Sequence, residues 1–278
     1  LNGPGLTCTA GTGREETPMI LAIDIGNTTV SFCALCEPGE AARPFSAKMD
    51  TQPVLTGQEY LSRMQKKLQA LAPEAHLNGA ILTSVVPDAE EPLAYCARML
   101  TGKAPLRVTW QNCGLRMAVD NPAAVGRDRF VDAAWAAANL PLPAVTVDMG
   151  TATTFNVIGK SGVFLGGVIA PGLATALDAL SARAAQLPPI DLVTPEHAIG
   201  RNTLECMQIG AVTGAAALIE GITDRIEAEL GEEVSLAVTG GLSHWVSPMI
   251  RREHRYVPDL LQQGLGLLYR RLSEKENR

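Results

Sequence analysis

Two segments of this sequence place an aspartate, a glycine and hydroxyl side chains in the same order. The first is Asp24-Ile25-Gly26-Asn27-Thr28-Thr29, and the second is Asp148-Met149-Gly150-Thr151-Ala152-Thr153. A glycine without Cβ lets backbone N–H groups approach phosphate oxygens, and threonine hydroxyls add further donors. An aspartate beside them can hold Mg²⁺, directly or through water, or another cation that neutralises the phosphates. One such segment would be ordinary turn chemistry, whereas a matched pair predicts a shared phosphate-binding site.

A third acidic position, Asp128, stands between two arginines and after a glycine, in Val125-Gly126-Arg127-Asp128-Arg129. Its carboxylate can act as a general base that accepts a hydroxyl proton while the oxygen attacks a γ-phosphoryl group. The planar guanidinium of Arg129 suits a carboxylate on the substrate, and Arg127 can do the same or remain solvated. The alternative is that Asp128 only precedes a helix over 130–139, where the helix dipole favours an acid.

Two glycine-rich segments lie in the second half of the chain. Residues 166–172 are expected to carry the backbone past a ligand or a neighbouring domain, although turn chemistry alone would also explain them. The strand-like run 237–239 precedes Gly240 and Gly241, where an adenine ring could lie against bare backbone. The four histidines have no metal-ligand spacing, so none of them is a preferred catalytic candidate.

The elements that must position these residues are alternating strands and helices. Short apolar runs end at Asp24 and at Asp148, and each is followed by a second run with strand character. Helical spacing of apolar residues predicts helices over 57–71, 93–100 and 130–139, and another after 172. The expected strands are 20–24, 30–35, 41–49, 80–86, 106–109, 144–148, 152–158 and 163–170. This alternation is typical of α/β architecture.

The same strand–turn–strand unit in each half indicates two similar domains that face each other across a cleft. Pro141 and Pro143 interrupt the chain between the halves. We therefore expect an N-terminal domain over 19–140 and a C-terminal domain over 141–278. Residues 1–18 are rich in glycine, threonine and proline, and are expected to form a flexible extension before the folded part.

Composition narrows the class of protein. The 278 residues are 46% hydrophobic and 19% charged, as expected for a globular chain of two ordinary domains. The formal net charge is −6 without a long basic run, so neither nucleic acid nor a membrane is an expected partner. No uninterrupted apolar stretch reaches the length of a transmembrane helix. Six scattered cysteines indicate free thiols in a reducing compartment, and hence a cytoplasmic protein.

A long helix is expected from Asn202, with apolar residues recurring every three or four positions from Leu204 to Ile226. Gly210 and Gly214 lie within it. Glycine inside a helix costs up to ~1 kcal/mol relative to alanine and suggests a close neighbour. That neighbour is either a helix of the same chain or a second copy of the chain, and both interpretations stay open.

Four ordered motifs carry a family resemblance. They are Asp24-x-Gly-Asn-Thr28, Asn121-Pro-x-x-Val-Gly-x-Asp-Arg129, Asp148-x-Gly-Thr-Ala-Thr-Thr154 and Gly166-Gly-x-Ile-x-Pro-Gly172. With them the chain resembles the type III pantothenate kinases, the family that also contains the Bvg accessory factors. The resemblance implies two ribonuclease-H-like domains of the actin, Hsp70 and sugar-kinase type, and a homodimer. It also implies ATP-dependent phosphorylation of pantothenate to 4′-phosphopantothenate, which opens coenzyme A biosynthesis, with Mg²⁺ and either K⁺ or NH₄⁺.

The resemblance also implies roles for individual residues. Asp128 matches the proton acceptor, Asp148 the ligand of the monovalent cation, and Thr151 an ATP contact. Arg129 is expected to face the pantothenate carboxylate, and Thr203 to contact the substrate. The ATP-phosphate loop matches Asp24, Ile25, Gly26, Asn27, Thr28, Thr29, Val30 and Ser31, and the pantothenate loop matches Gly126, Arg127, Asp128 and Arg129.

One departure from the family pattern falls in the expected pantothenate pocket. The family usually has a tyrosine two residues before Asn-Pro, and this chain has Val119 there. That change is expected to alter the pocket wall without removing a group that takes part in phosphoryl transfer. One alternative is an accessory or regulatory protein that binds nucleotide with little activity, and the complete set of Asp24, Asp128 and Asp148 argues against it. Another is a different phosphotransferase or phosphatase on the same fold, although Arg129 beside Asp128 favours a small alcohol that carries a carboxylate.

Overall fold

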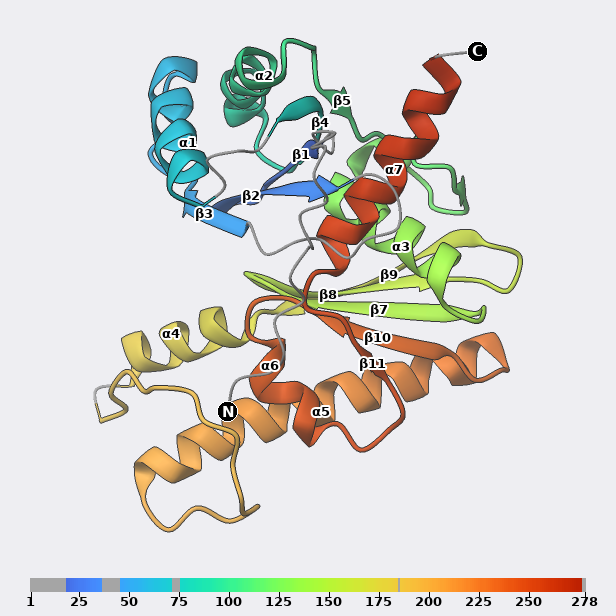
Figure 1. Cartoon of the computed structure of the whole chain (residues 1–278). Helices are drawn as coiled ribbons and strands as arrows, with labels where there is room; N and C mark the ends of the chain where they lie inside the picture. Colours follow the sequence, from blue (N-terminus) through green and yellow to red (C-terminus); the bar gives the residue numbers. More distant parts are fainter. Residues whose placement is uncertain (1–18, 37–45, 72–75, 185, 277–278) are drawn as a thin grey trace, which may run out of the picture.

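The computed structural model describes residues 19–36, 46–71, 76–184 and 186–276, which form two mixed β-sheets with helices between and outside them (Figure 1). The extension expected at 1–18 lies outside the described residues. So does the first part of the strand expected at 41–49, whose described part begins at Ser46.

The first sheet has the strand order β3-β2-β1-β4-β5. Its central strand β1 pairs antiparallel with β2 and parallel with β4, so the hairpin and the crossover connection lie on opposite sides of β1. Helices α1 and α2 bury Tyr60, Met64 and Leu93 against this sheet. The elements are β1 Met19–Ile25, β2 Thr29–Cys36, β3 Ser46–Asp50, α1 Gly57–Leu71, β4 Leu77–Ser84, α2 Pro87–Thr101 and β5 Leu106–Arg107.

The second sheet repeats this arrangement. Its order is β11-β10-β7-β8-β9-β6, and β7 pairs antiparallel with β8 and parallel with β10, as β1 does with β2 and β4. The α/β fold with two similar units, predicted from the repeated hairpin, is therefore confirmed, and so is the ribonuclease-H-like type that the family resemblance implied. The elements are β6 Arg116–Met117, β7 Ala144–Met149, β8 Ala152–Ile158, β9 Val163–Pro171, β10 Ser235–Thr239 and β11 Arg255–Tyr256.

Two helices lie between the sheets. Helix α3 (Arg127–Asn139) packs on β7, β8 and β4, and α7 (Leu260–Glu276) packs on α3 and on the first sheet (Figure 1). Trp135 of α3 is 1% exposed, and its indole N–H donates to Gln263 of α7 over 2.8 Å. The domain boundary at 140/141 stays a prediction. Helix α7 from beyond it packs on the first sheet, and β6 from before it joins the second.

Helices α4 (Leu173–Arg183) and α5 (Thr203–Leu230) belong to the second unit (Figure 1). Asn202 caps α5 by accepting a hydrogen bond from the backbone of Glu205 over 2.9 Å, as the predicted start requires. The fully buried α5 side chains are Val212, Ala216 and Ile219, which lie beside the predicted apolar stripe. Ala211 and Ala215 of that stripe pack against the same core and are partly buried. By length and composition α5 is the one helix of the described residues that could span a membrane, and a single such helix is weak evidence for that role.

Candidate active site

The two Asp-x-Gly hairpins meet. The hydroxyl oxygens of Thr28 and Thr151 lie 3.0 Å apart and share a hydrogen bond across the two units. A glycine N–H closes each turn: Gly26 donates to the carbonyl of Thr29 and Gly150 to that of Ala152, each over 3.0 Å, so the second turn is one residue shorter. The sequence repeat therefore becomes a spatial pair of turns with exposed hydroxyls, as a phosphate-binding site requires.

Glycines allow other backbone segments to approach the second hairpin. A Cβ on Gly172 would overlap the carbonyl oxygens of Gly150 and Thr151. A Cβ on Gly240, where φ is 101°, would overlap the backbone of Met149 and the carboxyl group of Asp148. The two glycine-rich segments singled out in the sequence therefore pack directly against the second Asp-x-Gly turn.

Three carboxyl groups from separate elements influence one another between the hairpins. Burial, and then the charges of Asp128 and Asp148, raise the pKa of Asp24 well above its ordinary value. Burial and then the charge of Asp128 raise the pKa of Asp148 to about 6, and burial raises that of Asp128. Clustered carboxylates repel one another, so a cation placed among them would relieve the repulsion. The three aspartates picked out in the sequence therefore lie within electrostatic range of one another.

A lysine that the sequence analysis missed counteracts part of this repulsion. The positive charge of Lys48 lowers the pKa of both Asp24 and Asp148. Lys48 pairs with Ser31, and Ser31 pairs with Asp24, so the three residues form one row across β3, β2 and β1. Opposed residues of paired antiparallel strands share a face of the sheet, so Lys48 stands on the same face as Asp24.

Asp128 lies in the first turn of α3, which begins at Arg127 rather than after Arg129. Its Oδ1 accepts a hydrogen bond from the backbone N–H of Arg129 over 2.8 Å. A Cβ on Gly126 would come within 2.6 Å of this oxygen, so the glycine leaves the space in which the carboxyl group lies. The place of Asp128 in the first helical turn supports the interpretation that it stabilises the helix through the helix dipole. Its burial beside other acidic groups supports the interpretation that it acts as a general base.

Arg129 is held by the second sheet. Its Nε donates to Asn156 Oδ1 over 2.7 Å and its Nη2 donates to the carbonyl of Phe155 over 3.2 Å. The guanidinium carbon lies 5.7 Å from the centre of the Phe164 ring. A Cβ on Gly167 would lie 2.9 Å from Nη2, so a side chain there would crowd the guanidinium. No described acceptor binds Nη1, so one nitrogen of the fork remains for a ligand.

Arg127 points to a different partner from Arg129. Its Nη1 donates to both carboxylate oxygens of Glu90 on α2, each over 2.9 Å. Glu90 is 9% exposed and also pairs with Arg107 over 3.2 Å. The side chains of Arg107 and Arg127 are both partly exposed. The arrangement ties α3 to α2 and leaves Arg127 with a structural partner, which the sequence pattern did not reveal.

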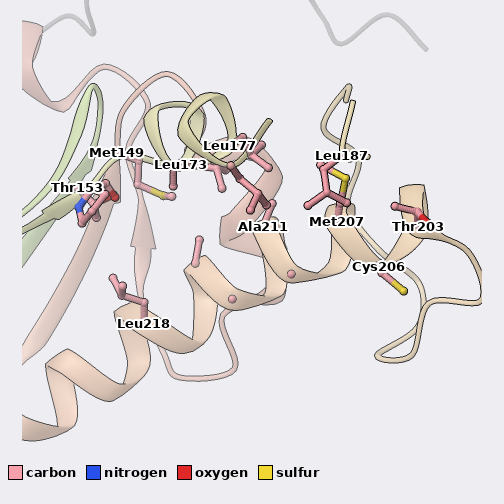
Figure 2. A pocket seen from close by; sticks show the side chains of 16 residues that line it. Met149, Thr153, Leu173, Leu177, Leu187, Thr203, Cys206, Met207, Ala211 and Leu218 are labelled. Carbon is pink, nitrogen blue, oxygen red and sulfur yellow. The ribbon is translucent and has the colours of Figure 1, made fainter. Parts of the chain in front are cut away.

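An apolar pocket of about 660 Å³ runs between α4 and α5 from the second hairpin (Figure 2). Met149 and Thr153 line one end, and Thr203 lies at the other, beyond Met207 and Ala211 (Figure 2). Thr203 is exposed at the start of α5, and no described hydrogen bond joins it to Asp128 or Arg129. Val119 is half-buried, near Gly166 of β9.

The donor set around the hairpins suits hard cations. Carboxylates and hydroxyls are the available groups, and Mg²⁺ and K⁺ both prefer such oxygen ligands. Within the described ranges no group of three or more His, Cys, Asp or Glu side chains could hold a metal ion by itself. A cation here would therefore take part of its ligands from water or from a phosphate group.

The four cysteines with described side chains, Cys33, Cys96, Cys113 and Cys206, are free thiols, as predicted.

Comparison with known proteins gives a consistent family. The family model described as type III pantothenate kinase matches residues 20–225. The type III pantothenate kinase of Moorella thermoacetica is 36% identical over 254 residues, which cover 91% of this chain and 99% of that protein. Both the identity and the coverage are high enough to show family membership.

Solved structures with low sequence identity share the fold. A Baf family transcriptional activator from Campylobacter jejuni superposes with a TM-score of 0.58 at 18% identity, over 93% of this chain and 100% of that chain. The activator of 2-hydroxyisocaproyl-CoA dehydratase from Clostridium difficile, solved with bound ADPNP, gives 0.52 at 16% identity, over 93% and 96%. These likenesses support the fold alone.

Proposed function

Because the chain belongs to the type III pantothenate kinase family, we propose that it transfers the γ-phosphoryl group of ATP to the 4′-hydroxyl of pantothenate. The observation that carries this proposal is the convergence of Asp24, Asp128 and Asp148 beside the touching Thr28 and Thr151 hydroxyls. Two phosphate-binding turns, a buried base and a free arginine nitrogen are the parts that such a transfer needs.

Asp128 is the proposed general base. Its carboxylate accepts the proton of the pantothenate hydroxyl while that oxygen bonds to the γ-phosphorus. The bond from the γ-phosphorus to the β,γ-bridging oxygen breaks, and ADP leaves with the electron pair. Burial raises the pKa of Asp128, which makes its carboxylate a stronger base than a solvated aspartate.

The two hairpins hold the phosphates and their cations. Residues Asp24–Ser31 and Thr151 provide backbone N–H groups and hydroxyls for ATP, while Asp24 binds Mg²⁺, directly or through water. Asp148 is the proposed ligand of K⁺ or NH₄⁺. These cations supply positive charge that offsets both the phosphates and the clustered carboxylates. The raised pKa values of Asp24 and Asp148 support this role, because a bound cation would favour their ionised forms.

Pantothenate recognition is assigned to the loop that leads into α3. Gly126 leaves room for the Asp128 carboxyl group, and Arg129 offers Nη1 to the pantothenate carboxylate. Arg127 belongs to the same loop, but its pairing with Glu90 favours a supporting role. Val119, beside Gly166, is proposed to line the pantothenate site, which is separate from the apolar pocket between α4 and α5.

The accessory-protein alternative is not favoured. The curated relatives that match nearly the full length of this chain are kinases by name, and all three aspartates are present. The test is ADP production from Mg-ATP by the purified protein, with and without pantothenate, in K⁺ and in Na⁺ buffers. We expect pantothenate-dependent ADP that increases with K⁺. Folded protein that makes no such ADP in either salt would overturn the kinase assignment.

A homodimer through α5 is the proposed assembly, in the cytoplasm. Leu204 and Leu218 of α5 are 48% and 37% exposed, and a Cβ on Gly210 or Gly214 would meet no atom within 4 Å. Gly210 and Gly214 also line the pocket below α4, so the proposal is that a second copy covers the open side of this face and brings Thr203 to substrate. Light scattering should give a dimer mass, and Leu218→Glu should give a folded monomer. A monomeric parent protein would refute this assembly.

A further inference from the structure

One buried acid takes no part in the mechanism above. Asp132 lies one turn after Asp128 on α3 and is 1% exposed. Its Oδ2 accepts a hydrogen bond from Asn156 Nδ2 over 3.3 Å, while its Oδ1 has no partner in the described part of the chain. Burial, followed by the charges of Asp148, Asp128 and Asp24, raises its pKa well above the ordinary value. Burying an incompletely paired carboxyl group costs free energy, so a stabilising role does not explain it.

Asn156 connects Asp132 to Arg129. It is fully buried in β8, and its Nδ2 also donates to Thr146 Oγ1 over 3.2 Å. These two acceptors fix the direction of the amide, so that Oδ1 faces Arg129 Nε over 2.7 Å. The hydroxyl of Thr146 can donate as well as accept, so Thr146 alone would allow the amide to rotate. A rotated amide would turn a donor toward the Arg129 donor, and the arginine would lose this hydrogen bond.

We propose that Asp132 is a positioning residue that fixes the Asn156 amide and through it directs the Arg129 guanidinium toward the pantothenate carboxylate. This inference rests on the proposed role of Arg129. Among the described residues, the other hydrogen bond of that side chain goes to the Phe155 carbonyl, its ring contact is the face of Phe164, and the charges of Asp128 and Asp132 act on it without fixing its orientation. An aromatic face lets a guanidinium slide or rotate, whereas the Nε bond sets its orientation.

The test compares Asp132→Ala with Asp132→Asn. Asparagine keeps an oxygen that can accept from Asn156, and alanine does not. Asp132→Ala should raise the KM for pantothenate by about tenfold, as expected when a hydrogen bond to a charged group is lost, and leave the KM for ATP within about twofold. Asp132→Asn should return the KM for pantothenate to within about threefold of the parent value. If Asp132→Ala does not fold, Asp132→Val fills more of the space and gives the same comparison.

A double-mutant cycle separates this inference from the role of Arg129. Arg129→Ala should raise the KM for pantothenate, and adding Asp132→Ala to it should change that KM by less than about twofold. An unchanged KM in Arg129→Ala would refute the proposed role of Arg129. If Arg129→Ala does raise the KM for pantothenate, three results would overturn the Asp132 inference alone. Asp132→Ala could change the KM for pantothenate and the KM for ATP equally, or change neither, or Asp132→Asn could raise the KM for pantothenate as much as Asp132→Ala does.

Discussion

Replacing Asp128 by asparagine should leave ATP binding intact and slow turnover by ~10²–10⁴-fold, the range for loss of a general base. The ground-state geometry should survive, because asparagine retains an oxygen that accepts the 2.8 Å hydrogen bond from the backbone of Arg129. The change also removes one of the charges that raise the pKa of Asp24 and Asp148. Folding should therefore be as stable as in the parent protein, or more so.

The competing explanation is that Asp128 only stabilises the start of α3. An acid at a helix N-terminus contributes ~0.3–1 kcal/mol, whereas a hundredfold loss of turnover corresponds to ~2.7 kcal/mol of transition-state stabilisation. Asp88 is a matched control, since it is an exposed aspartate in the first turn of α2. Asp88→Asn should lose the same helix-dipole contribution and keep its turnover.

Three measurements on both variants decide between these explanations: kcat from ADP release, ATP affinity by calorimetry, and melting temperature. We expect Asp128→Asn to lose kcat with its ATP affinity and melting temperature at or above the parent values, and Asp88→Asn to keep its kcat with a melting temperature at or slightly below that of the parent. A kcat of Asp128→Asn within about threefold of the parent would remove Asp128 from the mechanism. A large loss that coincides with a fall in melting temperature would assign the effect to the helix start instead.

Further predictions concern pH, packing and an ion pair. Without K⁺ or NH₄⁺, the melting temperature should increase as the pH is lowered from about 7 to about 5. The pKa of Asp148 is raised to about 6 in the folded state, so as the pH falls the folded chain binds this proton before the unfolded chain does. Asp148→Asn should lose this part of the increase. Gly167→Ala should lower the melting temperature by about 2–4 °C for each kcal/mol of stability that the steric overlap removes. It should also raise the KM for pantothenate, because the new methyl group would crowd Arg129. Gly221→Ala should change neither quantity. Glu90→Gln should destabilise by about 1–3 kcal/mol in denaturant titration with the KM for pantothenate unchanged; a tenfold rise in that KM would make Arg127 a substrate ligand.

The fold and the positions of Asp24 and Asp148 could be predicted because their signals are local. An apolar run that ends in Asp-x-Gly and hydroxyls predicts a strand, a turn and a second strand within ten or so residues, and its repetition predicts two units. Asp24 and Asp148 therefore lie at the ends of β1 and β7 as expected.

The supporting residues could not be predicted because their partners are distant in sequence. Asn156 occupies one position in an otherwise ordinary strand, and nothing near it indicates that it binds Arg129. Lys48 acquires its role only through the register of three strands. Periodicity predicted only part of the buried surface of α5. Val212, Ala216 and Ile219 are buried beside the predicted stripe, because apolar residues cover more than one face of this helix.

The hydrogen bond between Thr28 and Thr151 is a direct link between the two units. Both hydroxyls are exposed, and their oxygens lie 3.0 Å apart, too close for a phosphate group to lie between them. In the proposed reaction each hydroxyl would turn from the other to a phosphate oxygen, so nucleotide would replace one link between the units by another. The phosphate chain would then join the two units, and any hinge motion between them would be coupled to nucleotide binding and release.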